Sequence, residues 1–408
     1  MMKKSLRTLE VILKTAERCN LDCPYCYFFY AGNDDYKKHP PLIAPSIANS
    51  VASYLQQAIQ DYGLEAVEID FHGGEPMLLK KQAFVRLCST LRGALDTKCK
   101  LRLGMQTNGT LIDDEWIAIF EEFEVGIGVS LDGPAAINDI NRVDHRGRGS
   151  YADAARGFKL LSEAAKNGRC NAPGLLCVIN PSHDARAILR HFVFELGATY
   201  IDFLLPDVTR NTVDPYPKQR YGQYLTDLYL EWLTIGRKDV HIRCIARAVS
   251  PLVGGRRAGS VYLDAVRSRH AITIATNGDV GPNDIFKIID RPYFSRYNVA
   301  TSSLREFMED EDVKELIEAE LTLPKDCRSC CWRDACHGGE VYNRYDKRTG
   351  FDNPSSFCVA YKHLYSFIAA HLIESGTVSS SQVCASLGLT EDSDKKAQTY
   401  GYAASSDV

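Results

Sequence analysis

The sequence predicts an α/β protein, built as a partial (β/α)6 barrel of the TIM type and followed by a smaller cysteine-rich domain. Two observations lead to this prediction. Six short apolar runs end in Gly, Asn, Asp or Pro, as buried parallel strands do. Amphipathic helical patterns lie between these runs, as in a sheet with right-handed crossovers. Six units are too few for a closed eight-fold barrel, and a doubly wound open sheet is the alternative fold.

Polar residues gather at the carboxyl ends of the expected strands, in "HGGEP", "QTNGT" and "SLDG", and "LLP" ends the last of these strands. Ligands bind at this edge of a parallel sheet in either fold, so we expect the functional site there. The strands are expected at 10–16, 66–74, 100–109, 126–133, 174–180 and 200–206. Helices are expected at 79–95, 113–123, 150–166, 184–197 and 216–236.

The strand–helix alternation ends after about residue 206, and this divides the chain. A length of 408 residues exceeds one ordinary domain but allows a barrel with an appendage. The Ser-rich C-terminal end has little apolar periodicity, which is typical of a disordered segment. We expect a barrel over 1–215, a helical linker over 216–262, a cysteine-rich domain over 263–375 and a flexible tail over 376–408.

Charge and hydropathy narrow the class of protein. Lys and Arg number 48 against 52 Asp and Glu, so the basic footprint of a nucleic-acid binder is missing. No stretch reaches the roughly 20 apolar residues of a membrane span, and no signal peptide is evident. We therefore expect a cytoplasmic protein with neither a nucleic acid nor a membrane as partner. In a reducing compartment, the 14 cysteines are better read as metal ligands or buried thiols than as disulfides.

Three cysteines follow the first expected strand directly. Cys19, Cys23 and Cys26 have the spacing C-x3-C-x2-C. Three thiolates can hold three irons of a [4Fe–4S] cluster and leave the fourth iron open for a small molecule. The alternative is a zinc loop completed by a distant residue, although zinc more often uses paired C-x2-C units. The spacing favours the iron–sulfur interpretation.

A second group of cysteines lies near the C-terminal end. Cys327, Cys330, Cys336 and Cys358 supply four thiolates, enough to close a [4Fe–4S] cluster. A structural zinc knuckle and buried free thiols are the alternatives. Cys331 adjoins Cys330 and is awkward as a further ligand, so we leave it out of the set.

The first half of the chain resembles the radical S-adenosylmethionine (radical SAM) enzymes. The resemblance rests on "CNLDCPYCY", on "GGEP" at 73–76, on "TNGT" at 107–110 and on "SLDG" at 130–133, and it covers roughly residues 8–210. It implies that the open iron chelates SAM. A low-potential electron then cleaves SAM, and the resulting 5′-deoxyadenosyl radical takes a hydrogen atom from the substrate.

The same resemblance implies a set of SAM contacts at the strand ends. Glycines allow close approach of the methionine amine, and an arginine can pair with the carboxylate in a fork geometry. Each motif alone could be an ordinary turn or surface residue. The order in which the motifs follow one another along the chain favours the interpretation that they bind SAM. The expected contacts are Tyr25, Gly73, Gly74, Glu75, Gln106, Asn108, Ser130, Arg142, Leu204 and Leu205.

The second cysteine group resembles the SPASM domain of peptide-modifying radical SAM enzymes, which usually carries two auxiliary clusters. Asn283 stands where a hairpin cysteine is expected, and Glu340 stands where another is expected after Cys336. We therefore expect one auxiliary [4Fe–4S] cluster, on Cys327, Cys330, Cys336 and Cys358. The pieces "CHGG" and "GFDNPSSFC" look most like the maturases that form cyclophanes in ribosomally made peptides.

This resemblance implies a peptide-modifying oxidoreductase that removes a Cβ hydrogen and joins that carbon to an aromatic ring. Its partners would be a precursor peptide, with leader and core, and a low-potential donor such as flavodoxin or ferredoxin. Asp284 is the candidate base, and a turn residue is the plain alternative. Other possible activities are formylglycine formation, as in the anaerobic sulfatase maturases, and thioether formation. A third, more remote hypothesis is a non-catalytic binding module stabilised by metal.

Overall fold

The protein is described by a computed structural model over residues 6–254 and 258–389. Residues 255–257 of the expected linker and 390–408 of the expected tail lie outside the described residues. Within the described ranges, no helix combines the length and the apolar character that crossing a bilayer requires. The cytoplasmic location stays a prediction.

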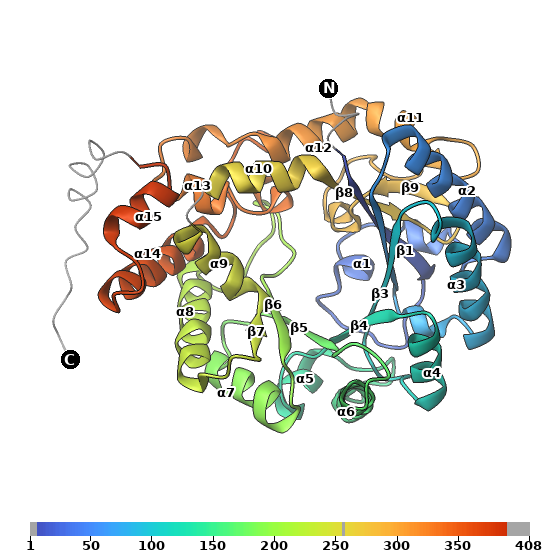
Figure 1. Ribbon diagram of the computed structural model, residues 1–408, viewed down its shortest axis with the longest axis horizontal. Coiled ribbons are helices and arrows are strands. Elements are labelled where there is room, and N and C mark those ends of the chain that lie inside the picture. The colour runs from blue at the N-terminus through green and yellow to red at the C-terminus, as the bar shows by residue number, and fades with distance from the viewer. Residues whose placement is uncertain (1–5, 255–257, 390–408) are drawn as a thin grey trace.

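One mixed sheet of ten strands runs through the described residues (Figure 1). Its central strands β1 to β6 are parallel and neighbour one another in chain order, which confirms the predicted fold class. The sheet stays open, because β8 continues it beside β1 and β7 continues it beside β6. The strands are β1 Thr8–Ala16, β2 Ala66–Gly73, β3 Lys100–Thr107, β4 Val125–Ser130, β5 Gly174–Val178, β6 Tyr200–Leu204, β7 His241–Ile242, β8 Arg269–Ile274, β9 Asp279–Pro282 and β10 Tyr297–Asn298.

The two faces of the barrel strands differ in polarity. Successive side chains of a strand point to opposite faces. On β1, Leu9, Val11 and Leu13 are fully buried in the main apolar core, whereas Glu10 and Lys14 face the barrel interior. β2 and β3 repeat this alternation, and β4 contributes glycines at its inward positions. The inner face of the barrel strands is therefore polar.

Helices cover the outer face of the barrel (Figure 1). Asp113 and Asp184 cap two of them by accepting hydrogen bonds from backbone N–H groups of the first turn. The helix expected over 184–197 ends earlier as an α-helix and continues as a π-type turn over His191–Glu195. The helices of this part are α1 Tyr27–Tyr30, α2 Pro45–Tyr62, α3 Lys81–Leu95, α4 Asp114–Glu122, α5 Ala135–Asn141, α6 Tyr151–Lys166, α7 Ala185–Arg190, α8 Lys218–Ile235 and α9 Arg243–Val253.

The C-terminal part joins the barrel instead of standing apart from it. The hairpin of β8 and β9 enters the main sheet, because β8 pairs in parallel with β1. The domain boundaries expected from the sequence stay a prediction, although helix α15 begins at Ser380, inside the expected tail, and buries Val383. The remaining helices are α10 Ala258–Ser268, α11 Leu304–Glu309, α12 Glu311–Leu321, α13 Arg333–Cys336, α14 Cys358–Glu374 and α15 Ser380–Ser386. Short 3-10 turns include Asp284–Ile288 (η5) and Val341–Arg344 (η7).

Candidate functional site

The first cysteine loop leaves the carboxyl end of β1 and crosses the mouth of the barrel. The thiols of Cys19, Cys23 and Cys26 lie close enough to act on one another electrostatically. Burial raises the pKa of all three, to about 12 for Cys19. The backbone N–H of Leu21 donates to Cys19 Sγ at 3.4 Å. Three neighbouring sulfurs, with a backbone N–H group directed at Cys19, suit the thiolate ligands of an iron–sulfur cluster.

The two glycines of "GGEP" are required by the cysteine loop itself. Gly73 has φ +144°, and a Cβ there would lie 1.9 Å from the carbonyl oxygen of Ala16. A Cβ on Gly74 would lie 2.3 Å from the carbonyl oxygen of Arg18. These contacts fix the end of β2 against the loop, and the predicted contact of both glycines with SAM stays a prediction.

Glu75 acts as a brace between two strand ends. Its carboxylate is fully buried and accepts hydrogen bonds from Met77 N at 3.0 Å, Thr107 Oγ1 at 2.8 Å and Asn108 N at 2.8 Å. Burial raises the pKa of Glu75 to about 7 against these stabilising bonds. Both carboxylate oxygens are therefore occupied by protein donors, and Glu75 positions the ends of β2 and β3.

Arg142 has a protein partner at the site. Its Nε lies 3.0 Å from Asp132 Oδ2 and its Nη2 lies 3.3 Å from Asp132 Oδ1. Tyr25 donates its hydroxyl to the same carboxylate, and the guanidinium lies 5.6 Å from the Tyr25 ring centroid. The sequence suggested Arg142 as a partner of the methionine carboxylate but did not suggest Asp132. In the structure, the two N–H groups of the Arg142 guanidinium that could bind a carboxylate side by side donate to Asp132.

The remaining predicted contacts lie at or near the same strand ends. Gln106 Nε2 donates to Ser130 Oγ at 2.7 Å inside the barrel. Asn108 Nδ2 donates to Asn20 Oδ1 at 2.8 Å, next to the cysteine loop. Leu204 ends β6 and is half-buried, and Leu205 packs against the main core.

A hollow of about 1020 Å³ opens at the carboxyl ends of β4, β5 and β6. Tyr25 and Asp132 line it, as do Val178, Asn180 and Pro206. The last three were missed by sequence reasoning. Their signal was their place at or just after the ends of β5 and β6, and the predicted Leu204 and Leu205 directly precede Pro206. The hollow lies beside the cysteine loop and is the candidate binding site.

Asp284 lies in a buried charged cluster under the cysteine loop. It forms an ion pair with Lys14, and both side chains are buried. Tyr27 donates its hydroxyl to Asp284 Oδ2 at 2.6 Å, and His72 Nδ1 lies 2.9 Å from Lys14 Nζ. Although burial acts to raise it, the pKa of Asp284 lies well below its usual range because of the Lys14 charge. Sequence reasoning missed Lys14, whose signal was a lysine inside an otherwise apolar strand.

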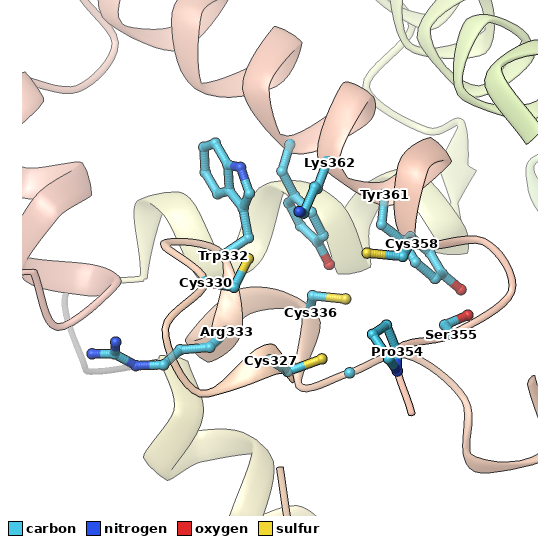
Figure 2. Close-up of a pocket in the computed structure, with 12 residues that line it drawn as sticks. Cys327, Cys330, Trp332, Arg333, Cys336, Pro354, Ser355, Cys358, Tyr361 and Lys362 are labelled. Carbon is cyan, nitrogen blue, oxygen red and sulfur yellow. The ribbon is translucent and has the colours of Figure 1, made fainter. Parts of the chain in front are cut away.

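The second cysteine group surrounds a hollow of about 340 Å³ (Figure 2). The sulfur atoms of Cys327, Cys330, Cys336 and Cys358 face this common space. Burial raises the pKa of Cys336 to about 12, and the other three thiols act on it electrostatically. Cys331 is exposed, outside the hollow. Over the described residues, no three His, Cys, Asp or Glu side chains form a site for a single metal ion.

A buried arginine fixes the loop that carries Cys336. Arg344 is almost fully buried and donates through Nη2 to the carbonyl oxygens of His337 at 2.6 Å and Gly339 at 2.7 Å. Its Nη1 donates to the carbonyl oxygen of Ala319 at 2.8 Å. One guanidinium thereby ties helix α12 to the segment after Cys336, so the position of the thiol group depends on it.

Comparisons with known proteins agree with this geometry. Residues 13–184 match the Radical SAM superfamily model. A cysteine-type anaerobic sulfatase-maturating enzyme of Clostridium perfringens is 23% identical over 381 residues, which cover 90% of this chain and 97% of the relative. A serine-type anaerobic sulfatase-maturating enzyme of Bacteroides thetaiotaomicron is 27% identical over 387 residues, with 87% of each chain covered.

Solved structures support the fold. One described as native anSMEcpe with bound AdoMet and Cp18Cys peptide superposes with a TM-score of 0.72 at 22% identity and covers 91% of this chain and 99% of that chain. Streptococcus suis SuiB superposes with a TM-score of 0.59 at 17% identity and covers 87% of this chain. At such identities the likeness concerns the fold alone.

The prediction of cyclophane formation is wrong. It rested on two short pieces near the C-terminal end, whereas sulfatase-maturating enzymes match nearly the whole chain. A match over some 35 residues reflects loop geometry around the four thiols more than the reaction. The sequence motifs, the barrel, the three-thiol loop and the family match lead to one conclusion: the chain contains a radical SAM domain and is a radical SAM enzyme.

Proposed function

We propose that this enzyme oxidises a cysteine or serine side chain of a sulfatase-type polypeptide to formylglycine. The observation that carries the proposal is the length of the similarity to sulfatase-maturating enzymes, which spans 97% of the Clostridium perfringens relative. Because it covers 90% of this chain, that span includes the second cysteine group and Asp284. The substrate partner would be a peptide segment that reaches the hollow at the barrel mouth.

The residues present fit the cofactors that such a reaction needs. Cys19, Cys23 and Cys26 would hold a [4Fe–4S] cluster with SAM on its open iron. The four thiols around the second hollow would hold one auxiliary [4Fe–4S] cluster, which would supply an electron acceptor. When bound, the first cluster and SAM supply a 5′-deoxyadenosyl radical that removes a hydrogen atom from the substrate. An external low-potential donor, such as flavodoxin or ferredoxin, would provide the electron.

The chain itself would position the substrate and remove a proton. The hollow beside Tyr25 gives the reacting carbon room next to the cysteine loop. After hydrogen-atom removal, the substrate loses one electron and one proton and gains a double bond to its oxygen or sulfur. A serine substrate becomes the aldehyde directly. A cysteine substrate becomes a thioaldehyde, which water converts to the aldehyde with release of hydrogen sulfide.

The test is anaerobic incubation of the reconstituted enzyme with SAM, a reductant and sulfatase-derived peptides. One peptide carries cysteine at the target position, one serine and one alanine. We expect a hydrazide-reactive aldehyde from the cysteine peptide, the serine peptide or both, located by tandem mass spectrometry, and none from the alanine peptide. Cleavage of SAM without an aldehyde from either peptide would overturn the proposal.

A further inference from the structure

One segment of the chain connects the two hollows. Residues 208–216, which come after β6, line the hollow at the barrel mouth with Val213 and Tyr216 among others, and we call them the wall segment. Residues 343–358 contribute to the lining of the four-thiol hollow and end at the thiol of Cys358. Contacts between these two segments therefore join the candidate binding site to the candidate site of the auxiliary cluster.

Arg210 links the two segments through its main chain and its side chain. Its backbone N–H donates to the carbonyl oxygen of Tyr345 at 3.0 Å, and its Nη1 donates to the carbonyl oxygen of Pro354 at 2.8 Å. Pro354 lines the four-thiol hollow (Figure 2). The next residue, Asn211, donates through Nδ2 to Asp346 Oδ2 at 3.2 Å. Two consecutive residues of the wall segment are thus bonded to the segment of the four-thiol site.

Asn343 makes a further link, and its side chain is fully buried. Its Nδ2 donates to the carbonyl oxygen of Val208 at 2.7 Å. Its own carbonyl oxygen accepts hydrogen bonds from Ser356 N and Ser356 Oγ, each at 2.9 Å. Ser356 stands two positions before Cys358. A chain of hydrogen bonds therefore runs from the start of the wall segment to the neighbourhood of a thiol of the four-thiol site.

The hydrogen-bonding partners of the wall segment lie on the four-thiol side. Over the part of the chain that the structure describes, every hydrogen bond from residues 208–213 to another segment ends on residues 343–354. Beyond the wall segment, Tyr221 on α8 also lines the barrel-mouth hollow, and its ring lies 5.1 Å from the Phe357 ring in edge-to-face contact. Phe357 directly precedes Cys358. This side of the hollow therefore depends on the order of the four-thiol segment.

We propose that the four-thiol site holds the wall segment in place for the peptide substrate, with Arg210 as the positioning residue. This inference rests on the proposed function, because the ligand of the wall segment is the peptide. Val213 is 92% exposed and lines the hollow, so the wall segment offers apolar surface to the peptide. Residues 343–358 are fixed when the four thiols bind their cluster, and their hydrogen bonds then fix the wall segment. Because coupling between two sites is reciprocal, bound peptide also stabilises the four-thiol site.

Hydrogen–deuterium exchange of the anaerobic holoenzyme tests this coupling without turnover. For Arg210→Ala, which loses the bond to Pro354, we expect the amides of residues 208–216 to exchange about 5- to 10-fold faster, because opening the wall segment no longer breaks that bond. Arg210→Lys should restore part of the protection. Arg92→Ala is the matched control, since Arg92 on α3 donates in the same way to the carbonyl oxygen of Phe123 at 2.6 Å. Wild-type exchange of the wall segment in Arg210→Ala would overturn the proposal.

Removing one ligand of the four-thiol site tests the coupling from the other side. In reconstituted Cys336→Ala we expect residues 208–216 to exchange faster, whereas Cys331→Ala, whose thiol is exposed outside the hollow, should match the wild type. Strands β2 and β3 are the internal reference, because a misfolded variant would lose their protection as well, and Arg210→Ala alone then decides. Wild-type exchange of the wall segment in folded Cys336→Ala would show that the four-thiol site does not hold it.

Peptide kinetics separate positioning from chemistry. For Arg210→Ala we expect the KM for the peptide to rise about 5- to 10-fold while kcat stays within about 2-fold of the wild type, because the wall segment binds the peptide but takes no part in the reaction. Arg210→Lys should lie between the two. A lower kcat at unchanged KM would contradict the positioning role. If the wild type forms no aldehyde, the proposed function fails, and the exchange experiments still decide whether the two sites are coupled.

Discussion

The two cysteine groups differ in how many thiols they offer and in what surrounds them. The loop after β1 offers three thiols beside a hollow of about 1020 Å³. The C-terminal group offers four thiols around a hollow of about 340 Å³, held by the buried Arg344. Three ligands at an open site suit a reactive iron, and four ligands around a small site suit electron transfer. The difference shows how one chain can give two similar clusters different functions, through the number of protein ligands and the space beside the cluster for a small molecule.

The strongest test of this contrast removes one thiol from the open site. For Cys26→Ala we expect SAM cleavage to fall to background, because the cluster loses one of three protein ligands. The measurement is 5′-deoxyadenosine formation with reductant and SAM. Cys331→Ala is the matched control, since its thiol is exposed, and it should cleave SAM at the wild-type rate. Robust cleavage by Cys26→Ala would break the assignment of the open site.

Removing a thiol from the closed site should separate two activities. For Cys336→Ala we expect about half of the wild-type iron content and little aldehyde, while SAM cleavage stays within a few-fold of wild type. The reason is that the auxiliary cluster would accept an electron but would take no part in cleaving SAM. Iron analysis and the ratio of aldehyde to 5′-deoxyadenosine check this. An unchanged ratio would show that the second cluster is dispensable for the oxidation.

The ion pair beside the open site should contribute strongly to stability. Asp132→Asn leaves the Arg142 guanidinium buried without its charged partner, and we expect a loss of about 3–5 kcal/mol in the free energy of unfolding. Denaturant unfolding of the anaerobic protein measures it. Asp239→Asn, which breaks the exposed pair with Arg237, should change the free energy of unfolding far less, because water screens that pair. Equal effects of the two substitutions would contradict the structural role of Asp132.

The buried carboxyl group of Glu75, which links the ends of β2 and β3, should make the free energy of unfolding depend on pH. Burial raises the pKa of Glu75 from 4.5 to about 7, so the folded state holds a proton that the unfolded state releases. The resulting stabilisation is fully present below pH 4.5 and is lost as pH rises through about 7, by up to about 3 kcal/mol. Glu75→Gln should lack this slope in unfolding experiments between pH 5 and 8. An unchanged slope would show that other groups cause it.

Much of the barrel could be predicted because its signals are local. Each of the six strands is a short run with a turn residue at its end, and the spacing of Cys19, Cys23 and Cys26 is a local pattern too. The polar inner face of the strands was harder to see, since Glu10 and Lys14 look like interruptions of an apolar run. Helix α2 escaped notice, and the parallel pairing of β8 with β1 depends on contacts between distant parts of the chain.

The charge partners at the site could not be predicted for the same reason. Lys14 and Asp284 are 270 residues apart in the chain, and their pairing depends on β8 and β9 joining the sheet beside β1. The resemblance to the SPASM maturases pointed to Asp284 as a base, but only the fold brings Lys14 to it. The reaction was mispredicted because the prediction relied on a short segment around four thiols, whereas the similarity to sulfatase-maturating enzymes extends over nearly the whole chain.

The central claim is that only the cluster on Cys19, Cys23 and Cys26 has an iron open to SAM. Electron–nuclear double resonance of the reduced protein with SAM labelled by ¹⁵N at its amino group tests this directly. We expect a ¹⁵N coupling in the wild type and in Cys336→Ala, and none in Cys26→Ala. A coupling that survives in Cys26→Ala and disappears in Cys336→Ala would contradict the claim, because SAM would then bind the cluster of the four-thiol site.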